Sequence, residues 1–140
     1  MTASPDPASR DLANQVLAAR CGWLRDLADS LELASAALIH QNLGALRYQT
    51  GRQQDICRNL LQSGALAPPD LSLRDPGMQP ELQREMAQLA NLVARRNRTY
   101  AALLRRARRT VNIFCRVLEH AAVTYPEPGQ ALRIVVLPKE

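Results

Sequence analysis

Apolar residues recur every three or four positions over two long stretches of the chain. The longer series extends over about 45 residues, roughly from Glu81 to Tyr125, and one of its positions is polar, at Arg96; the helix that carries it is expected over about residues 80–124. A period near 3.5 that persists this far predicts a helix that packs lengthwise against other helices. The apolar members of the series are Leu82, Met86, Leu89, Val93, Tyr100, Leu103, Ala107, Val111, Phe114, Leu118, Ala121 and Tyr125.

The other series predicts a first helix from residue 9 to about 62, with Ser9 as its N-cap. Its centre is diluted by Gln and Asn, and by Gly44 and Gly51, each of which costs a helix about 1 kcal/mol relative to Ala. The pattern allows one bent helix, or two helices broken near one of these glycines, and we favour one helix. The apolar positions are Leu12, Val16, Ala19, Trp23, Leu27, Leu31, Ala34, Leu38, Ile56 and Leu60.

Proline and glycine mark the ends of these segments. Residues 1–8 are polar and Pro-rich, which predicts a disordered N-terminus. Ser63 and Gly64 give a helix stop, residues 63–79 form a connector, and Pro80 suits the first position of the second helix. Residues 126–140 are expected to be a flexible tail. We therefore predict one all-α domain, residues 9–125, in which two long antiparallel helices form an elongated hairpin or coiled-coil bundle.

Positive charge is concentrated in the second helix. The formal net charge is +5, and no acid lies between Glu85 and Glu119. The arginines of this region are Arg95, Arg96, Arg98, Arg105, Arg106, Arg108, Arg109 and Arg116. Such a row can follow a phosphate backbone, but no aromatic residues are interleaved for base stacking. A solvated face or an acidic protein partner is the favoured interpretation, and nucleic acid the less favoured one.

The sequence offers no constellation for catalysis or for a metal. His40 and His120 are the only histidines, and the three cysteines have no metal-ligand spacing. Glu119 and His120 point about 100° apart on a helix, so they do not form an acid–base pair. We expect a protein that is not an enzyme and has no cofactor. The unpaired cysteines, and the lack of a signal peptide or of an 18-residue apolar run, predict a cytoplasmic protein without membrane insertion.

Several sequence elements together suggest a family. Asn91 and Asn97 are separated by five residues, a Leu/Arg-rich stretch covers residues 103–109, and Thr124-Tyr125 is followed by Gly129. A Gln-Gln-x-x-Cys segment, residues 53–57, lies near the end of the first predicted helix. Over residues 10 to 130 this pattern resembles the FlgN family of flagellar export chaperones.

The resemblance implies a cytoplasmic chaperone without enzymatic activity. Such a protein would bind the C-terminal region of hook-associated proteins of the FlgK and FlgL type, prevent their premature assembly and deliver them to the type III export gate. The gate protein FlhA would be the docking partner, and the family motif places that contact on Tyr125 and Gly129. Pro126 and Pro128 depart from the family pattern, because they stiffen the segment in which a docking helix would form.

An apolar groove along helices is the surface that an unpaired client helix needs. We place partner binding on an apolar set that includes the tail, which either contacts a partner or folds back on its own helices. Two other functions stay open: a coiled-coil adaptor or homo-oligomer with no role in secretion, and a helical nucleic-acid-binding protein. The candidate partner-binding residues are Val111, Phe114, Leu118, Tyr125, Gly129, Leu132, Ile134 and Val135.

Overall fold

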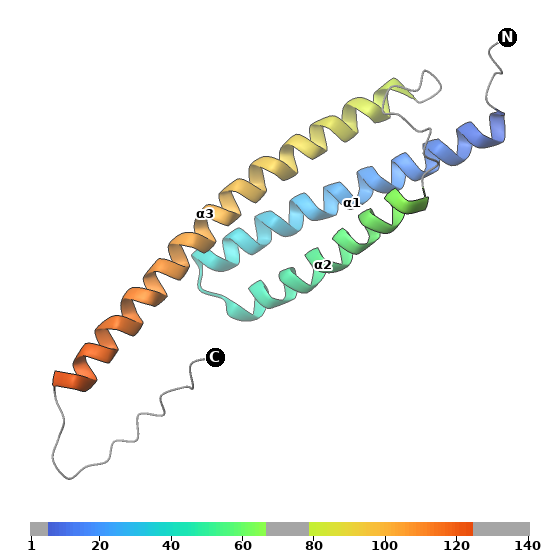
Figure 1. Cartoon of the computed structure of the whole chain (residues 1–140). Helices are drawn as coiled ribbons and strands as arrows, with labels where there is room; N and C mark the ends of the chain where they lie inside the picture. Colours follow the sequence, from blue (N-terminus) through green and yellow to red (C-terminus); the bar gives the residue numbers. More distant parts are fainter. Residues whose placement is uncertain (1–5, 67–78, 125–140) are drawn as a thin grey trace. The chain divides into compact units, whose positions relative to one another are not determined.

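The described part of the chain consists of three α-helices (Figure 1). The structure, a computed structural model, describes residues 6–66 and 79–124. The helices are α1 (Pro7–Ile39), α2 (Leu43–Leu66) and α3 (Pro80–Thr124), and no strand occurs in the described residues. The all-α prediction is confirmed. The chain divides into two units, Met1–Arg105 and Arg106–Glu140, which are treated separately below, and α3 contributes residues to both.

Helix α1 begins two residues earlier than predicted, with Asp6 rather than Ser9 as its N-cap. A carboxylate oxygen of Asp6 accepts a hydrogen bond from the Ala8 N–H at 3.4 Å. Pro7 occupies the first helical position, where its missing N–H leaves no bond unmade. Ser9 instead donates its backbone N–H to the Asp6 carbonyl at 2.9 Å.

The predicted single helix over residues 9–62 is wrong, because the chain reverses at residues 40–42 and α2 then continues to Leu66. Gln41 has a φ of 57°, and the N–H of Asn42 donates to the Ala37 carbonyl at 2.8 Å. The N–H of Gln41 donates to the Leu38 carbonyl at 3.2 Å, which completes a Schellman motif. Asn42 then caps α2, since its side-chain oxygen accepts the Ala45 N–H at 3.0 Å.

Within the unit Met1–Arg105, α2 runs antiparallel to α1 and α3 runs parallel to α1 (Figure 1). The two-helix antiparallel hairpin is therefore replaced by three helices, because the reversal at residues 40–42 adds a change of direction. Helices α2 and α3 both lie beside α1 and together bury part of its surface. The buried residues of α1 are Leu17, Cys21, Ala28, Ser30, Leu31, Ala34 and Ala37.

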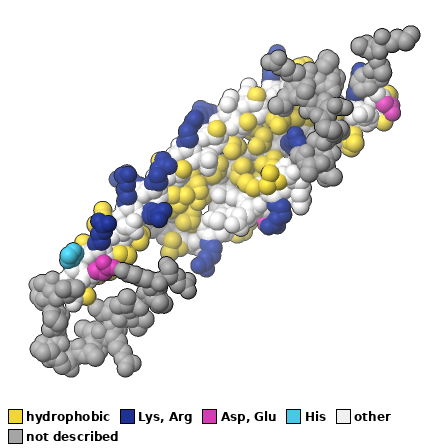
Figure 2. Space-filling model, viewed as in Figure 1, with side chains coloured by type: hydrophobic (Ala, Val, Ile, Leu, Met, Phe, Trp, Pro, Cys, Tyr) yellow, Lys and Arg dark blue, Asp and Glu magenta, His cyan; other side chains and the backbone are white. Residues whose placement is uncertain are grey.

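The core of this unit joins α1 to α3. Leu31, Ala34 and Tyr100 form a buried cluster, and Leu27, Leu38, Leu46 and Val93 pack against it. Figure 2 shows hydrophobic side chains gathered between the helices. The apolar series of α3 from Leu82 to Leu103 is partly or fully buried, as the sequence predicted. The series of α1 is less well predicted, because Leu12 is 58% exposed whereas Leu17 and Cys21 are buried.

Buried polar side chains fix the register of α2 on α1. The Ser30 hydroxyl, which is fully buried, donates to the Gln49 side-chain oxygen at 2.8 Å. Near the other end of α2, the Arg20 guanidinium donates to the Ser63 hydroxyl at 3.2 Å and to the Ser63 carbonyl at 3.1 Å. A buried hydroxyl without a partner is costly, so these contacts favour this alignment of the two helices.

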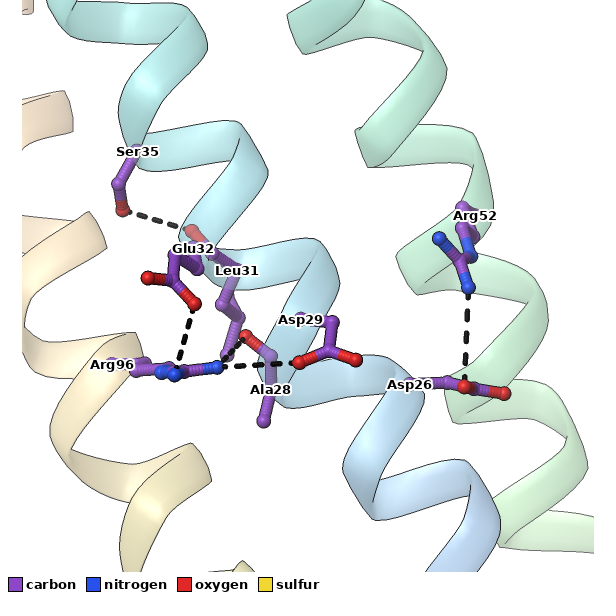
Figure 3. Close-up of polar contacts among 8 residues, drawn as sticks. All are labelled: Asp26, Ala28, Asp29, Leu31, Glu32, Ser35, Arg52 and Arg96. Carbon is purple, nitrogen blue, oxygen red and sulfur yellow. Dashed lines mark hydrogen bonds and ion pairs between the residues drawn. The ribbon is translucent and has the colours of Figure 1, made fainter.

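Arg96, the polar position in the apolar series of α3, contacts α1 (Figure 3). Its guanidinium donates to the Ala28 carbonyl at 2.9 Å, and lies 2.9 Å from a Glu32 carboxylate oxygen and 3.6 Å from an Asp29 oxygen. The side chain is 28% exposed, so its stem covers the apolar interface while its charged end meets the two acids. Arg25 of α1 also pairs with Glu85 of α3, about one turn before Asp29 in α1 and three turns before Arg96 in α3.

Candidate partner-binding surface on α3

The described residues of the unit Arg106–Glu140 form the last part of α3 and carry an exposed apolar surface. Val111, Phe114 and Leu118 are 60%, 65% and 63% exposed, respectively. Their spacing of three and four residues places them on one side of the helix. Ala107 and Ala121 continue the same spacing at both ends. We call these five residues the apolar stripe.

The sequence between residues 106 and 122 favours a continuous helix. It contains neither Pro nor Gly, and straight-chain residues with high helix propensity predominate at its N-terminal end. The Thr110 hydroxyl donates to the Arg106 carbonyl at 3.1 Å, so this poor helix former is accommodated within the turn. The apolar stripe is therefore presented on an intact helix.

Basic side chains flank the apolar stripe and cover the opposite side of the helix. Arg106 and Arg108 are the neighbours of Ala107, so they point about 100° to either side of the stripe. Arg109 and Arg116 lie on the side opposite to it. Figure 2 shows arginine side chains in a row along α3. Glu119 is the only acid among residues 106–122, which leaves this segment with a net charge of +3.

Three of the eight predicted partner-binding residues, Val111, Phe114 and Leu118, thus lie together on one exposed surface. The other five lie outside the described residues: Tyr125, Gly129, Leu132, Ile134 and Val135. Sequence reasoning did not assign Arg106 and Arg108 to this surface. The signal that identifies them is their position on either side of an apolar residue of the series.

Titratable side chains elsewhere in the described residues do not gather into a reactive cluster. Across residues 6–66 and 79–124, no group of three or more His, Cys, Asp or Glu side chains is placed to hold a metal ion. Cys57 and Cys115 are exposed free thiols. Burial raises the pKa of the Cys21 thiol, the Glu85 charge raises it further, and Arg25 acts in the opposite direction. Cys21 is therefore held as a neutral thiol, the form that is least reactive.

A shallow hollow of about 220 Å³ lies between α1 and α2. The half-buried Trp23 lines it, together with Val16 and Ala19 of α1 and with Asn59, Gln62 and Ser63 of α2. No cluster of charged groups converges on it, so it offers a place for an apolar contact rather than for a reaction.

No helix among the described residues is both long enough and apolar enough to cross a membrane. When the chain is compared with protein-family models, with curated proteins and with solved structures, it matches none of them.

Proposed function

We propose that this chain is a cytoplasmic export chaperone of the FlgN type. It binds the C-terminal region of hook-associated proteins of the FlgK and FlgL type, prevents their premature assembly and delivers them to the type III export gate. The observation that supports this proposal is the apolar stripe, in which Val111, Phe114 and Leu118 are each at least 60% exposed on one side of a helix. A surface of this kind is typical of a helix that binds another helix.

The stripe is large enough to contribute substantial binding free energy. Complete burial of a Val, Leu or Phe side chain contributes about 1.5–3 kcal/mol. Val111, Phe114 and Leu118 retain about 60% of their exposure, so covering them contributes on the order of 4 kcal/mol before the costs of association are subtracted. A client helix laid along the stripe would pack against α3 as a coiled coil, since the stripe keeps the 3.5-residue period.

Delivery to the gate is the second part of the proposal. By the family resemblance, Tyr125 and Gly129 provide the contact with FlhA, and both lie outside the described residues. The variant Tyr125→Ala should therefore leave client binding intact while export of the client falls. Equal loss of binding and export would reject this assignment.

The first test of the proposal is co-purification with a client. The full chain is expressed alone and together with the C-terminal segment of a hook-associated protein from the same genome, and both samples are analysed by size-exclusion chromatography with light scattering. We expect a stoichiometric complex. Leu118→Ala should weaken it about tenfold, because a large apolar contact of the interface is lost.

Ile113→Ala provides the matched control. Ile113 is 62% exposed, nearly the same as Leu118 at 63%, but it points about 140° away from Leu118 around the helix axis. This variant should bind the client as the unmodified chain does. Absence of any complex with the client segment would reject the chaperone function. A dimer or tetramer that is indifferent to the client would instead favour the coiled-coil adaptor.

A further inference from the structure

We propose that the partner of the apolar stripe is an amphipathic helix whose apolar face is flanked by acidic residues. The inference concerns the chemistry of the partner and rests on the proposed function for the choice of this surface. It is carried by the position of Arg106 and Arg108, which point to either side of Ala107 at the beginning of the stripe. A helix packed on the stripe would bring its own flanking positions close to these two guanidinium groups.

The net positive charge of residues 106–122 favours negatively charged residues at the flanking positions of the partner helix. Residues 106–122 carry four arginines and one acid, Glu119. All four arginines are exposed, and Glu119 is the only acid among residues 106–122. Complementary charges beside an apolar contact accelerate association and suppress partners of the wrong sign. An acidic flank on the partner is therefore favoured and a basic flank is disfavoured.

A second copy of this chain is a poorer occupant. Pairing the stripe with itself would bring two segments of net charge +3 together, with one Glu119 in each to oppose the four arginines of the other. Like charges at a helix–helix interface oppose association. The apolar contact would be satisfied by such a dimer, but its electrostatic complementarity would be poor.

Nucleic acid is also a poorer occupant of this surface. Phosphate binding would use the arginines but would leave the three large side chains of the stripe in water. Single-stranded nucleic acid stacks its bases on aromatic side chains, and the described residues 106–122 offer Phe114 alone. An acidic amphipathic helix uses both the apolar and the basic part of the surface.

The length of the stripe sets the length of the partner helix. From residue 107 to residue 121 the stripe extends about 21 Å at 1.5 Å per residue. A partner helix of about four turns covers that distance. Two probes are therefore suitable: synthetic 18-residue amphipathic peptides with the same leucine face, one with Glu and one with Gln at the positions that flank it.

Binding of both fluorescently labelled peptides to the full chain is measured by anisotropy at increasing NaCl concentration. Two exposed ion pairs predict that the Glu peptide binds about five- to tenfold more tightly at low salt, and that the difference narrows above about 0.5 M NaCl. The double variant Arg106→Gln/Arg108→Gln should lose most of this preference. The matched control, Arg109→Gln/Arg116→Gln, removes the same charge from the opposite side and should retain it.

Equal affinity for the two peptides at every salt concentration would overturn the inference. So would self-association that Leu118→Ala abolishes, because the occupant would then be a second copy, and so would displacement of the Glu peptide by a duplex DNA probe. Binding of the hook-associated segment distinguishes failure of the proposed function from failure of this inference. If it binds but is unaffected by Arg106→Gln/Arg108→Gln, the function stands and this inference fails. If it does not bind while the Glu peptide does, the function fails and the inference stands.

Discussion

Removal of the Arg96 guanidinium should destabilise the unit Met1–Arg105 by about 2–3 kcal/mol. A hydrogen bond to a charged group contributes about 1.5–3 kcal/mol, and Arg96 makes one of 2.9 Å to the Ala28 carbonyl. The pairs with Glu32 and Asp29 add less, about 0.2–1 kcal/mol each, because both carboxylates are more than half exposed. We take the low end of the first range, because the Ala28 carbonyl lies within α1 and keeps its hydrogen bond inside the helix when the Arg96 side chain is removed.

The measurement is urea unfolding of Arg96→Ala, followed by circular dichroism at 222 nm. The matched control is Arg25→Ala, which also removes an α1–α3 arginine pair, with Glu85, but has a more exposed side chain and no carbonyl contact among those described. The control should cost no more than about 1 kcal/mol. Repeating both titrations in 0.5 M NaCl should shrink the cost of Arg25→Ala more than that of Arg96→Ala, because the partly buried contact is screened less.

The reasoning would be refuted if Arg96→Ala and Arg25→Ala lost the same stability at both salt concentrations. Arg96 would then be one more surface arginine, and the polar position in the apolar series would need another explanation. A change in the slope of the urea titration, rather than in its midpoint alone, would show that the variant altered the extent of the folded structure.

Three further predictions concern the first unit. Gln41→Gly should raise the free energy of unfolding by about 1 kcal/mol in urea titration, because a φ of 57° is strained for residues with a Cβ; no gain would reject the strain. Gln49→Ala should lower it by about 1–2 kcal/mol, since the buried Ser30 hydroxyl loses its 2.8 Å acceptor, whereas an additional Ser30→Ala change should restore part of the loss. The raised pKa of Cys21 means that above pH 8.5 the folded state holds the thiol proton more tightly than the unfolded state does. Stability should therefore fall as the pH rises above about 8.5, and Cys21→Ala should flatten that dependence while Cys57→Ala should not.

Local signals predicted α3 well. Pro80 and an apolar period interrupted at Arg96 alone define the start and the course of this helix, and the structure has it over Pro80–Thr124, as expected. The break between α1 and α2 was harder to place, although Asn42 is a good N-cap. The residue in the left-handed conformation is Gln41 rather than the usual Gly, so the composition of the turn does not reveal the reversal.

The features that the sequence did not predict depend on contacts between residues far apart in the chain. Arg96 belongs to a row of arginines in the sequence, and only the packing of α3 beside α1 shows that it meets Asp29 and Glu32. The apolar period identified Val111, Phe114 and Leu118 as one side of a helix. It did not reveal that they are exposed, because buried and exposed stripes have the same spacing.

The three-residue junction between α1 and α2 also affects the order in which the chain folds during synthesis. Because the junction is short, contacts between α1 and α2, such as that of Ser30 with Gln49, join residues close in sequence. The α1–α2 hairpin can therefore form before α3 has been translated. Leu31 and Ala34 gain their contact with Tyr100 only later. The α1–α2 hairpin therefore leaves the ribosome with part of its apolar surface uncovered until the N-terminal half of α3 has been made. The apolar stripe is synthesised last, after the residues of α3 that complete this core.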